Sequence, residues 1–138
     1  MKTRNHKKAG FTLVELMVVA IIVAILAAVA IPLMAGNKER AAATEAQAGC
    51  SAILTAERVE RAENGAYIAA PAPDTLQGIE PGDLQGKYFD HTAYVTTVAG
   101  DQITVTATAN GTEAIAGTVI LNHNGVSGIT TWGGTLLD

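Results

Sequence analysis

An apolar run near the N-terminus constrains this chain more than any other feature. It covers 21 residues, from Phe11 to Ile31, and its only charged residue is Glu15. About 20 apolar residues in an α-helix span the ~30 Å hydrocarbon layer of a bilayer, so the run predicts a transmembrane helix. A carboxylate inside such a helix is costly and marks a functional position by default. Glu15 therefore needs a cationic partner, and cleavage after Gly10 would create one at the α-amine of Phe11, one helical turn away.

The residues around this run resemble the class III signal and N-terminal helix of type IV pilins and type II secretion pseudopilins. The resemblance is carried by GFTLVEL starting at Gly10, by Pro32, and by the basic leader residues Lys2, Arg4, Lys7 and Lys8. An ordinary secretory signal places its small residues after the apolar core, so this motif is specific. The similarity covers roughly the first 50 residues, and beyond them it is one of architecture.

The resemblance implies how the chain is processed and assembled. Prepilin peptidase would cut between Gly10 and Phe11 and N-methylate Phe11, and Glu15, with Thr12 in the same motif, would direct assembly. The implied partners are other copies of the chain in a helical homopolymer, the peptidase, and the pilus assembly machinery of the bacterial inner membrane. The alternative is a plain signal anchor, in which the Glu15 side chain snorkels to the nearby interface.

Two residues predict a helix break at the end of the apolar run. Pro32 lacks the amide hydrogen that a helix interior uses, and its ring crowds the preceding turn. Gly36 follows four residues later and costs up to ~1 kcal/mol of helix propensity relative to Ala. The resemblance implies partial melting of the helix in this region inside a filament.

The charge distribution bears on orientation and on partners. The chain has a formal net charge of −4, and removal of the four leader cations leaves 5 basic and 13 acidic side chains. The leader cations predict a cytoplasmic N-terminus before assembly, with everything after Pro32 outside the membrane. The mature chain would be acidic and does not favour nucleic acid, whose phosphates demand a cationic face.

A soluble continuation of the helix follows the apolar run and ends near Asn64-Gly65. One narrow face of this continuation carries small residues at steps of three and four, with Cys50 at its edge: Ala42, Ala46, Gly49, Ile53 and Ala56. The small residues of this face would let a sheet or another helix come close, and Cys50 is expected to be a buried small hydrophobe. Glu57 and Arg61 stand four residues apart and are expected to form an ion pair on the opposite, solvated face.

The remainder of the chain predicts a loop and a sheet. Prolines and glycines between residues 65 and 90 favour a long connecting loop with a short helical turn at Pro81–Leu84, which either contacts neighbouring subunits or simply wraps the sheet. Thr- and Val-rich runs at 91–99, 102–109, 117–122 and 126–132 alternate with period two and predict four strands joined as an antiparallel meander.

The expected fold class is therefore α+β, with a long N-terminal helix packed on a four-stranded antiparallel sheet, as in the pilin fold. The predicted division of the chain is as follows: 1–10 a cleaved leader, 11–36 the transmembrane and assembly helix, 37–64 its soluble half, 65–90 the connecting loop, and 91–138 the sheet head.

No catalytic or metal-binding constellation is found in the sequence, and no cofactor is predicted. His6 would leave with the leader, and His91 and His123 do not form a ligand pair at short spacing. A calcium site formed by loop acids stays open as an alternative, although their spacing is not that of a dedicated calcium loop. These acids are Asp74, Glu80, Asp83 and Asp90.

The prediction is a structural subunit of a type IV pilus-like filament and not an enzyme. It would be membrane-anchored as a precursor and extracellular once assembled. Two alternatives remain open: a type II secretion pseudopilin, and a minor tip pilin that binds a ligand.

Overall fold

The computed structural model describes residues 10–69, 76–111, 113 and 115–137. The leader cations and Asp74, on which some of the expectations above depend, lie outside these residues. The chain forms two compact units, Met1–Gly36 and Asn37–Asp138.

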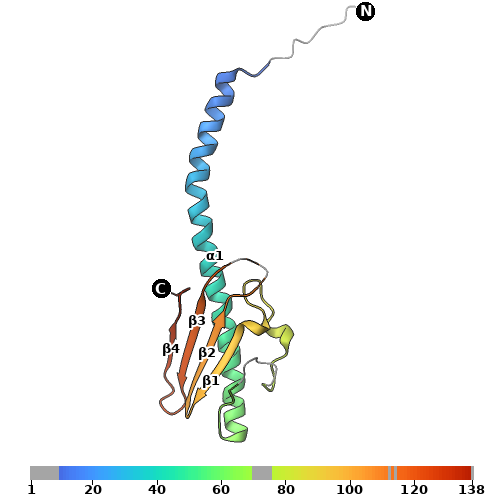
Figure 1. Ribbon diagram of the computed structural model, residues 1–138, viewed down its shortest axis with the longest axis vertical. Helices are drawn as coiled ribbons and strands as arrows, with labels where there is room; N and C mark the ends of the chain where they lie inside the picture. The colour runs from blue at the N-terminus through green and yellow to red at the C-terminus, as the bar shows by residue number, and fades with distance from the viewer. Residues whose placement is uncertain (1–9, 70–75, 112, 114, 138) are drawn as a thin grey trace, which may run out of the picture. The chain divides into compact units, whose positions relative to one another are not determined.

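A single helix, α1, runs from Leu13 to Asn64 and contributes to both units (Figure 1). It ends where the sequence predicts, because Gly65 adopts a φ of +82°, a conformation that glycine reaches without steric cost. The Gly65 amide donates to the carbonyl of Arg61 at 2.8 Å and so satisfies one of the last free carbonyls of the helix.

The expected helix break at Pro32 and Gly36 is absent from the single chain, since α1 continues through both residues. A proline removes only one backbone hydrogen bond, and the residues on either side of it here are mostly good helix formers. Local unwinding at Pro32 and Gly36 inside a filament therefore stays a prediction.

The second unit contains one four-stranded antiparallel sheet in the order β1-β2-β3-β4 (Figure 1). Its strands are β1 Tyr94–Ala99, β2 Gln102–Thr108, β3 Thr118–Asn124 and β4 Thr130–Gly133. Pairing of Ala99 with Gln102 leaves Gly100 and Asp101 as a two-residue turn, with Gly100 at a φ of +61°. The predicted α+β fold, a helix packed on an antiparallel meander, is confirmed.

Some element boundaries differ from the prediction because side chains cap the chain locally. A 3-10 turn at His91–Ala93 precedes β1, since the Asp90 carboxylate accepts the Thr92 amide at 2.7 Å. The fourth strand begins four residues later than expected, because Asn124 Oδ1 accepts the amides of the next turn. The short helical turn predicted at Pro81–Leu84 is present.

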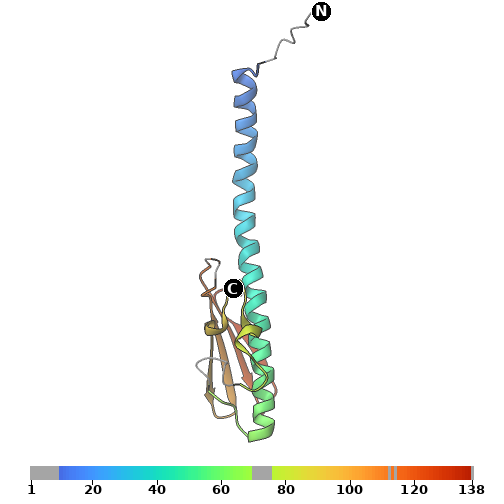
Figure 2. The same ribbon diagram turned by 90° about the vertical axis from the view of Figure 1, so that its right-hand side faces the viewer.

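The hydrophobic core lies between one face of the sheet and the second half of α1, which run side by side in Figures 1 and 2. The small-residue face of α1 is buried as predicted: Ala42, Ala46, Gly49, Ile53 and Ala56. Gly49 allows Tyr94 of the sheet to lie close to the helix, because a Cβ on residue 49 would overlap the Tyr94 ring. Cys50 is fully buried within this face.

The expected ion pair between Glu57 and Arg61 does not form. Glu57 is 0% exposed, and its Oε2 accepts the backbone amide of Ile68 at 3.0 Å. Arg61 instead donates to Asp101 at 2.5 Å. The prediction was wrong because the chain after the helix folds back over a second face of α1, which helix periodicity alone does not reveal.

Candidate functional site

The first turn of α1 is built by Thr12 and Glu15. The Thr12 amide and hydroxyl both donate to Glu15 Oε2, at 2.9 and 2.8 Å, and the Glu15 amide donates back to the Thr12 hydroxyl oxygen at 3.3 Å. This reciprocal arrangement is a capping box, which satisfies backbone donors that the first helical turn leaves free. The motif thus has a local structural role in the single chain.

The backbone just before this turn is open to an approaching protein. Gly10 and Phe11 lie outside α1, both are exposed, and a Cβ on Gly10 would have no neighbour within 4 Å. A peptidase needs an extended and accessible backbone at the bond that it cuts. The Gly10–Phe11 bond is accessible in this sense.

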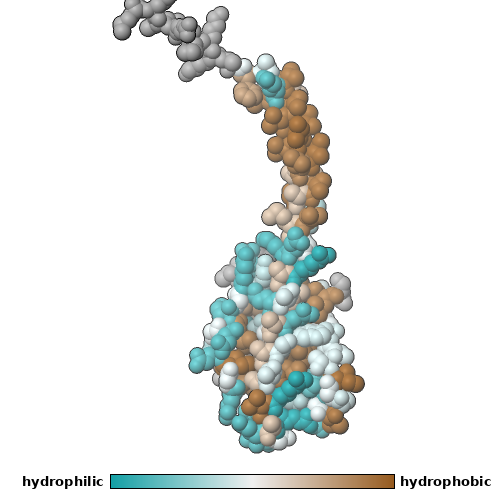
Figure 3. Space-filling view, turned by 180° about the vertical axis from the view of Figure 1, so that it is seen from behind, coloured by the Kyte–Doolittle hydropathy of each residue, from teal (hydrophilic) through white to brown (hydrophobic). Residues whose placement is uncertain are grey.

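The helix of the first unit exposes a continuous apolar surface. It includes an 18-residue window that is long and apolar enough to cross a membrane, and none of that window is buried. Figure 3 shows apolar side chains covering the face of this helix that is in view. Exposed side chains of this helix include Leu13, Met17, Ile21, Ile25, Val29 and Leu33. So large an apolar surface calls for lipid or for other protein.

Glu45 is a structural residue that the sequence did not reveal. Its carboxylate lies on α1 and accepts three consecutive backbone amides of the connecting loop, those of Lys87 at 3.1 Å and of Tyr88 and Phe89 at 2.8 Å each. Gly86 makes room for it, because a Cβ there would overlap the Glu45 carboxylate. A lone glutamate in an alanine-rich helix carries no sequence signal for this role.

The other residues considered from the sequence serve local structure. Asp83 accepts the Glu80 amide at 3.0 Å within its own loop, and Asp90 accepts the Asn110 side-chain amide at 2.9 Å, which joins the segment before β1 to the β2–β3 connection. The Thr92 hydroxyl donates to Asp90 at 2.6 Å, and this bond, together with those from the Thr92 amide and Asn110, holds the pKa of Asp90 below its usual range. In the described part of the chain, no three His, Cys, Asp or Glu side chains converge in a way that could hold a metal ion.

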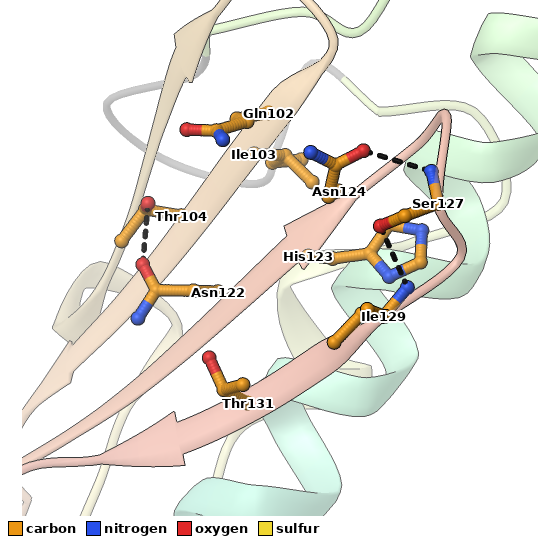
Figure 4. A pocket seen from close by; sticks show the side chains of 9 residues that line it. All are labelled: Gln102, Ile103, Thr104, Asn122, His123, Asn124, Ser127, Ile129 and Thr131. Atoms are coloured by element: carbon orange, nitrogen blue, oxygen red, sulfur yellow. Dashed lines mark hydrogen bonds between the residues drawn. The ribbon is translucent and has the colours of Figure 1, made fainter.

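A hollow of about 350 Å³ lies on the face of the sheet between β2, β3 and β4 (Figure 4). Its side chains are mainly amides and hydroxyls, and the Thr104 hydroxyl donates to Asn122 Oδ1 at 2.8 Å. The Asn124 and Ser127 side chains are used to cap the β3–β4 turn. His123, which also lines the hollow, has its Nδ1 at 2.8 Å from the Thr130 hydroxyl.

Comparison with known proteins agrees with the geometry of the N-terminal segment. Residues 5–31 match the prokaryotic N-terminal methylation motif. The chain is 33% identical to type II secretion system core protein G of Pseudomonas aeruginosa over 98 residues, which are 67% of this chain and 66% of that protein. It is 39% identical to type IV major pilin protein PilE1 of Neisseria gonorrhoeae over 111 residues, which are 77% of this chain and 55% of that pilin.

A further relative is type II secretion system core protein G of Vibrio cholerae, 39% identical over 77 residues, or 56% of this chain and 49% of that protein. The chain thus spans between about half and two thirds of the length of these relatives. An exposed apolar helix that opens with a methylation motif and continues into a small α+β head defines the prepilin class of protein. This chain belongs to the family of type IV pilins and type II secretion pseudopilins, whose members matched here are structural proteins rather than enzymes.

Proposed function

We propose that this chain is a structural subunit of a type IV pilus-like filament. In this proposal it is made as a precursor anchored in the bacterial inner membrane, with the leader in the cytoplasm and the head outside. Prepilin peptidase cuts between Gly10 and Phe11 and methylates Phe11. The subunits then leave the bilayer and pack through residues 11–31 into an extracellular filament, with the inner-membrane assembly machinery as a partner.

The observation that carries this proposal is the exposed apolar helix that holds one carboxylate near its start. Repeated head-to-tail contacts between identical apolar helices do not close on themselves, so they generate a fibre. Within such a fibre, Glu15 would be surrounded by apolar side chains of other subunits. A buried carboxylate is penalised unless it is paired, so the α-amine of Phe11 on the same or a neighbouring subunit would fix the axial register.

Assembly of a Glu15→Ala variant tests the proposal. Cells that express it should contain the cleaved subunit in the membrane but little or none in sheared filaments. Glu39→Ala is the control, because it removes an exposed carboxylate from the same helix outside residues 11–31. Normal filaments from Glu15→Ala would overturn the proposed role of the carboxylate.

A second candidate function is that of a type II secretion pseudopilin, which the similarity to core protein G supports. A pilus subunit and a pseudopilin would use the N-terminal helix in the same way, and they would differ in the head. Melting of the full-length chain in detergent with and without calcium separates the two candidates. A melting temperature that rises with calcium would favour the pseudopilin, and an unchanged one would favour the pilus subunit. A minor tip subunit that binds a ligand would be scarce in sheared filaments.

A further inference from the structure

A second hollow of the head, about 490 Å³ in volume, lies where the end of α1 meets the β3–β4 turn. Two arginines, a tyrosine and a histidine line it, namely Arg58, Arg61, Tyr67 and His123. All of them belong to the second unit. Two guanidinium groups on one side of a hollow set it apart from the rest of a head in which acidic side chains predominate.

Arg61 is held in place by several contacts. Its guanidinium donates to Asp101 at 2.5 Å and to the Tyr67 hydroxyl at 3.3 Å, and it lies 4.9 Å from the centre of the Tyr67 ring. Gly125 leaves space for it, because a Cβ there would overlap the guanidinium. A guanidinium ordered in this way loses little further conformational entropy when it binds an anion.

Arg58 supplies a positive charge that could bind an anion. Its guanidinium lies 3.5 Å from Nδ1 of His123, and the ion pairs of the described residues leave Arg58 without a carboxylate. The two arginines stand three residues apart on α1, so both reach the same side of the helix. Asp101 offsets one positive charge, and the hollow keeps a net charge of about +1 at neutral pH.

The positive charges of the two arginines act on the His123 ring in the hollow. His123 is only 5% exposed, and its pKa is lowered by burial first and then by Arg58 and Arg61. Tyr67 lies edge-on to its ring, with the centroids 6.4 Å apart. Burial and the two arginines therefore favour the neutral imidazole, and an anion bound beside it would raise its pKa again.

Helix electrostatics alone do not account for this arrangement. Cations in the last turns of a helix interact favourably with its C-terminal carbonyls, which would favour arginine here in any case. That effect does not require a glycine opposite the Arg61 guanidinium or a hollow in front of the two side chains. The hollow in front of the two guanidinium groups leaves room for a small ligand.

We propose that the hollow lined by Arg58, Arg61, Tyr67 and His123 binds a small oxyanion of the phosphate class. Donors reach it from neighbouring positions on one side of α1 and from the tyrosine beyond the helix, and this spread of donors suits a tetrahedral oxyanion better than a planar carboxylate. Guanidinium groups bind phosphate through parallel charge-assisted hydrogen bonds. This site goes beyond the filament role and does not depend on it.

The test is a titration of the full-length chain in detergent micelles with inorganic phosphate at constant ionic strength, followed by the NMR signals of the His123 ring. Phosphate should shift these signals in a saturable manner and raise the pKa of His123, while an equal ionic strength of chloride should not. Arg58→Gln should weaken binding about tenfold or more, as expected for loss of a charged hydrogen-bond donor. Arg40→Gln, which removes an equal charge elsewhere on α1, should have no effect.

Titrations with two further anions, glycerol phosphate and acetate, identify the class of anion that binds. Glycerol phosphate should bind as inorganic phosphate does if the hollow accepts a phosphate ester, and a stronger response to acetate would overturn the assignment to the phosphate class. A response that does not saturate, or that is the same in Arg58→Gln and the unaltered chain, would overturn the site itself. Arg58 is exposed, so its substitution should leave the fold intact, which circular dichroism checks.

Discussion

The Glu15 carboxylate lies 2.8 Å from the hydroxyl and 2.9 Å from the backbone nitrogen of Thr12, so the single chain already uses this carboxylate to begin its helix. Glu15 thus has two separable properties, an oxygen that caps the helix and a negative charge. Capping needs only the oxygen, whereas pairing with an α-amine needs the charge.

Glu15→Gln separates these properties, because the glutamine oxygen can still accept from Thr12. We expect the amount of subunit in sheared filaments to fall about tenfold or more, since an unpaired amine in an apolar site costs well over ~1.4 kcal/mol. Thr12→Ser, which keeps the hydroxyl, should assemble normally. Wild-type filament yield from Glu15→Gln would mean that capping, and not charge, is what assembly requires.

Glu45→Ala should destabilise the head, because three loop amides lose their shared acceptor. Hydrogen bonds to a charged group contribute about 1.5–3 kcal/mol each, and the solvent that replaces the carboxylate recovers part of this, so a loss of about 3 kcal/mol is expected. Thermal melting in detergent measures it. Glu39→Ala removes an exposed glutamate from the same helix and should change little; equal melting temperatures for the two variants would contradict the anchoring role.

The buried carboxyl group of Glu57 should make the free energy of unfolding depend on pH. Burial raises its pKa above the ordinary 4.5, the Ile68 amide opposes this rise, and the charge of Glu60 adds to it. A carboxyl group whose pKa is raised in the folded state makes its full contribution to the free energy of unfolding below pH 4.5. That contribution is lost as the pH rises through the pKa of the folded state. The steepest slope is about 1.4 kcal/mol per pH unit for one proton.

Denaturant unfolding of the full chain between pH 4 and 8 measures this effect. Glu57→Gln should flatten the part of the profile above pH 4.5, while Glu63→Gln, an exposed neighbour on α1, should leave it unchanged. A profile that is the same in Glu57→Gln and the unaltered chain would show that another group causes the dependence.

Cys50 should be inert in the folded protein. It is 0% exposed, and burial raises the pKa of its thiol to about 12, so almost no thiolate forms at pH 8. Because the thiolate is the reactive form, a thiol reagent should modify Cys50 only after denaturation. Rapid modification of the native chain would contradict the packing of α1 against the sheet.

The sequence predicted the fold because its strongest patterns are local. The apolar run, Gly65 and the alternating threonines define the helix, its end and the strands with little help from tertiary contacts. The roles of Glu45 and Glu57 could not be predicted, because each depends on where a loop distant in sequence crosses α1. The hollow at Arg58 likewise forms only when the β3–β4 turn is folded beside the helix.

The residues of the N-terminal motif were predictable for a different reason. Gly10, Phe11, Thr12 and Glu15 lie within seven residues of one another, so the motif is contained in the linear sequence. The structure adds the capping hydrogen bonds of Thr12 and Glu15, which spacing alone suggests but does not establish. Pairing of Glu15 with an amine involves the processed chain and its neighbours, so it stays a prediction.

The central claim is that this chain is processed and assembled through its N-terminal helix. Mass spectrometry of the intact subunit from sheared filaments tests it most directly. The account predicts a chain that begins at Phe11 and carries one added methyl group on its α-amine. A filament subunit that begins at Met1, or the absence of this chain from the filaments of cells that express it, would contradict the account.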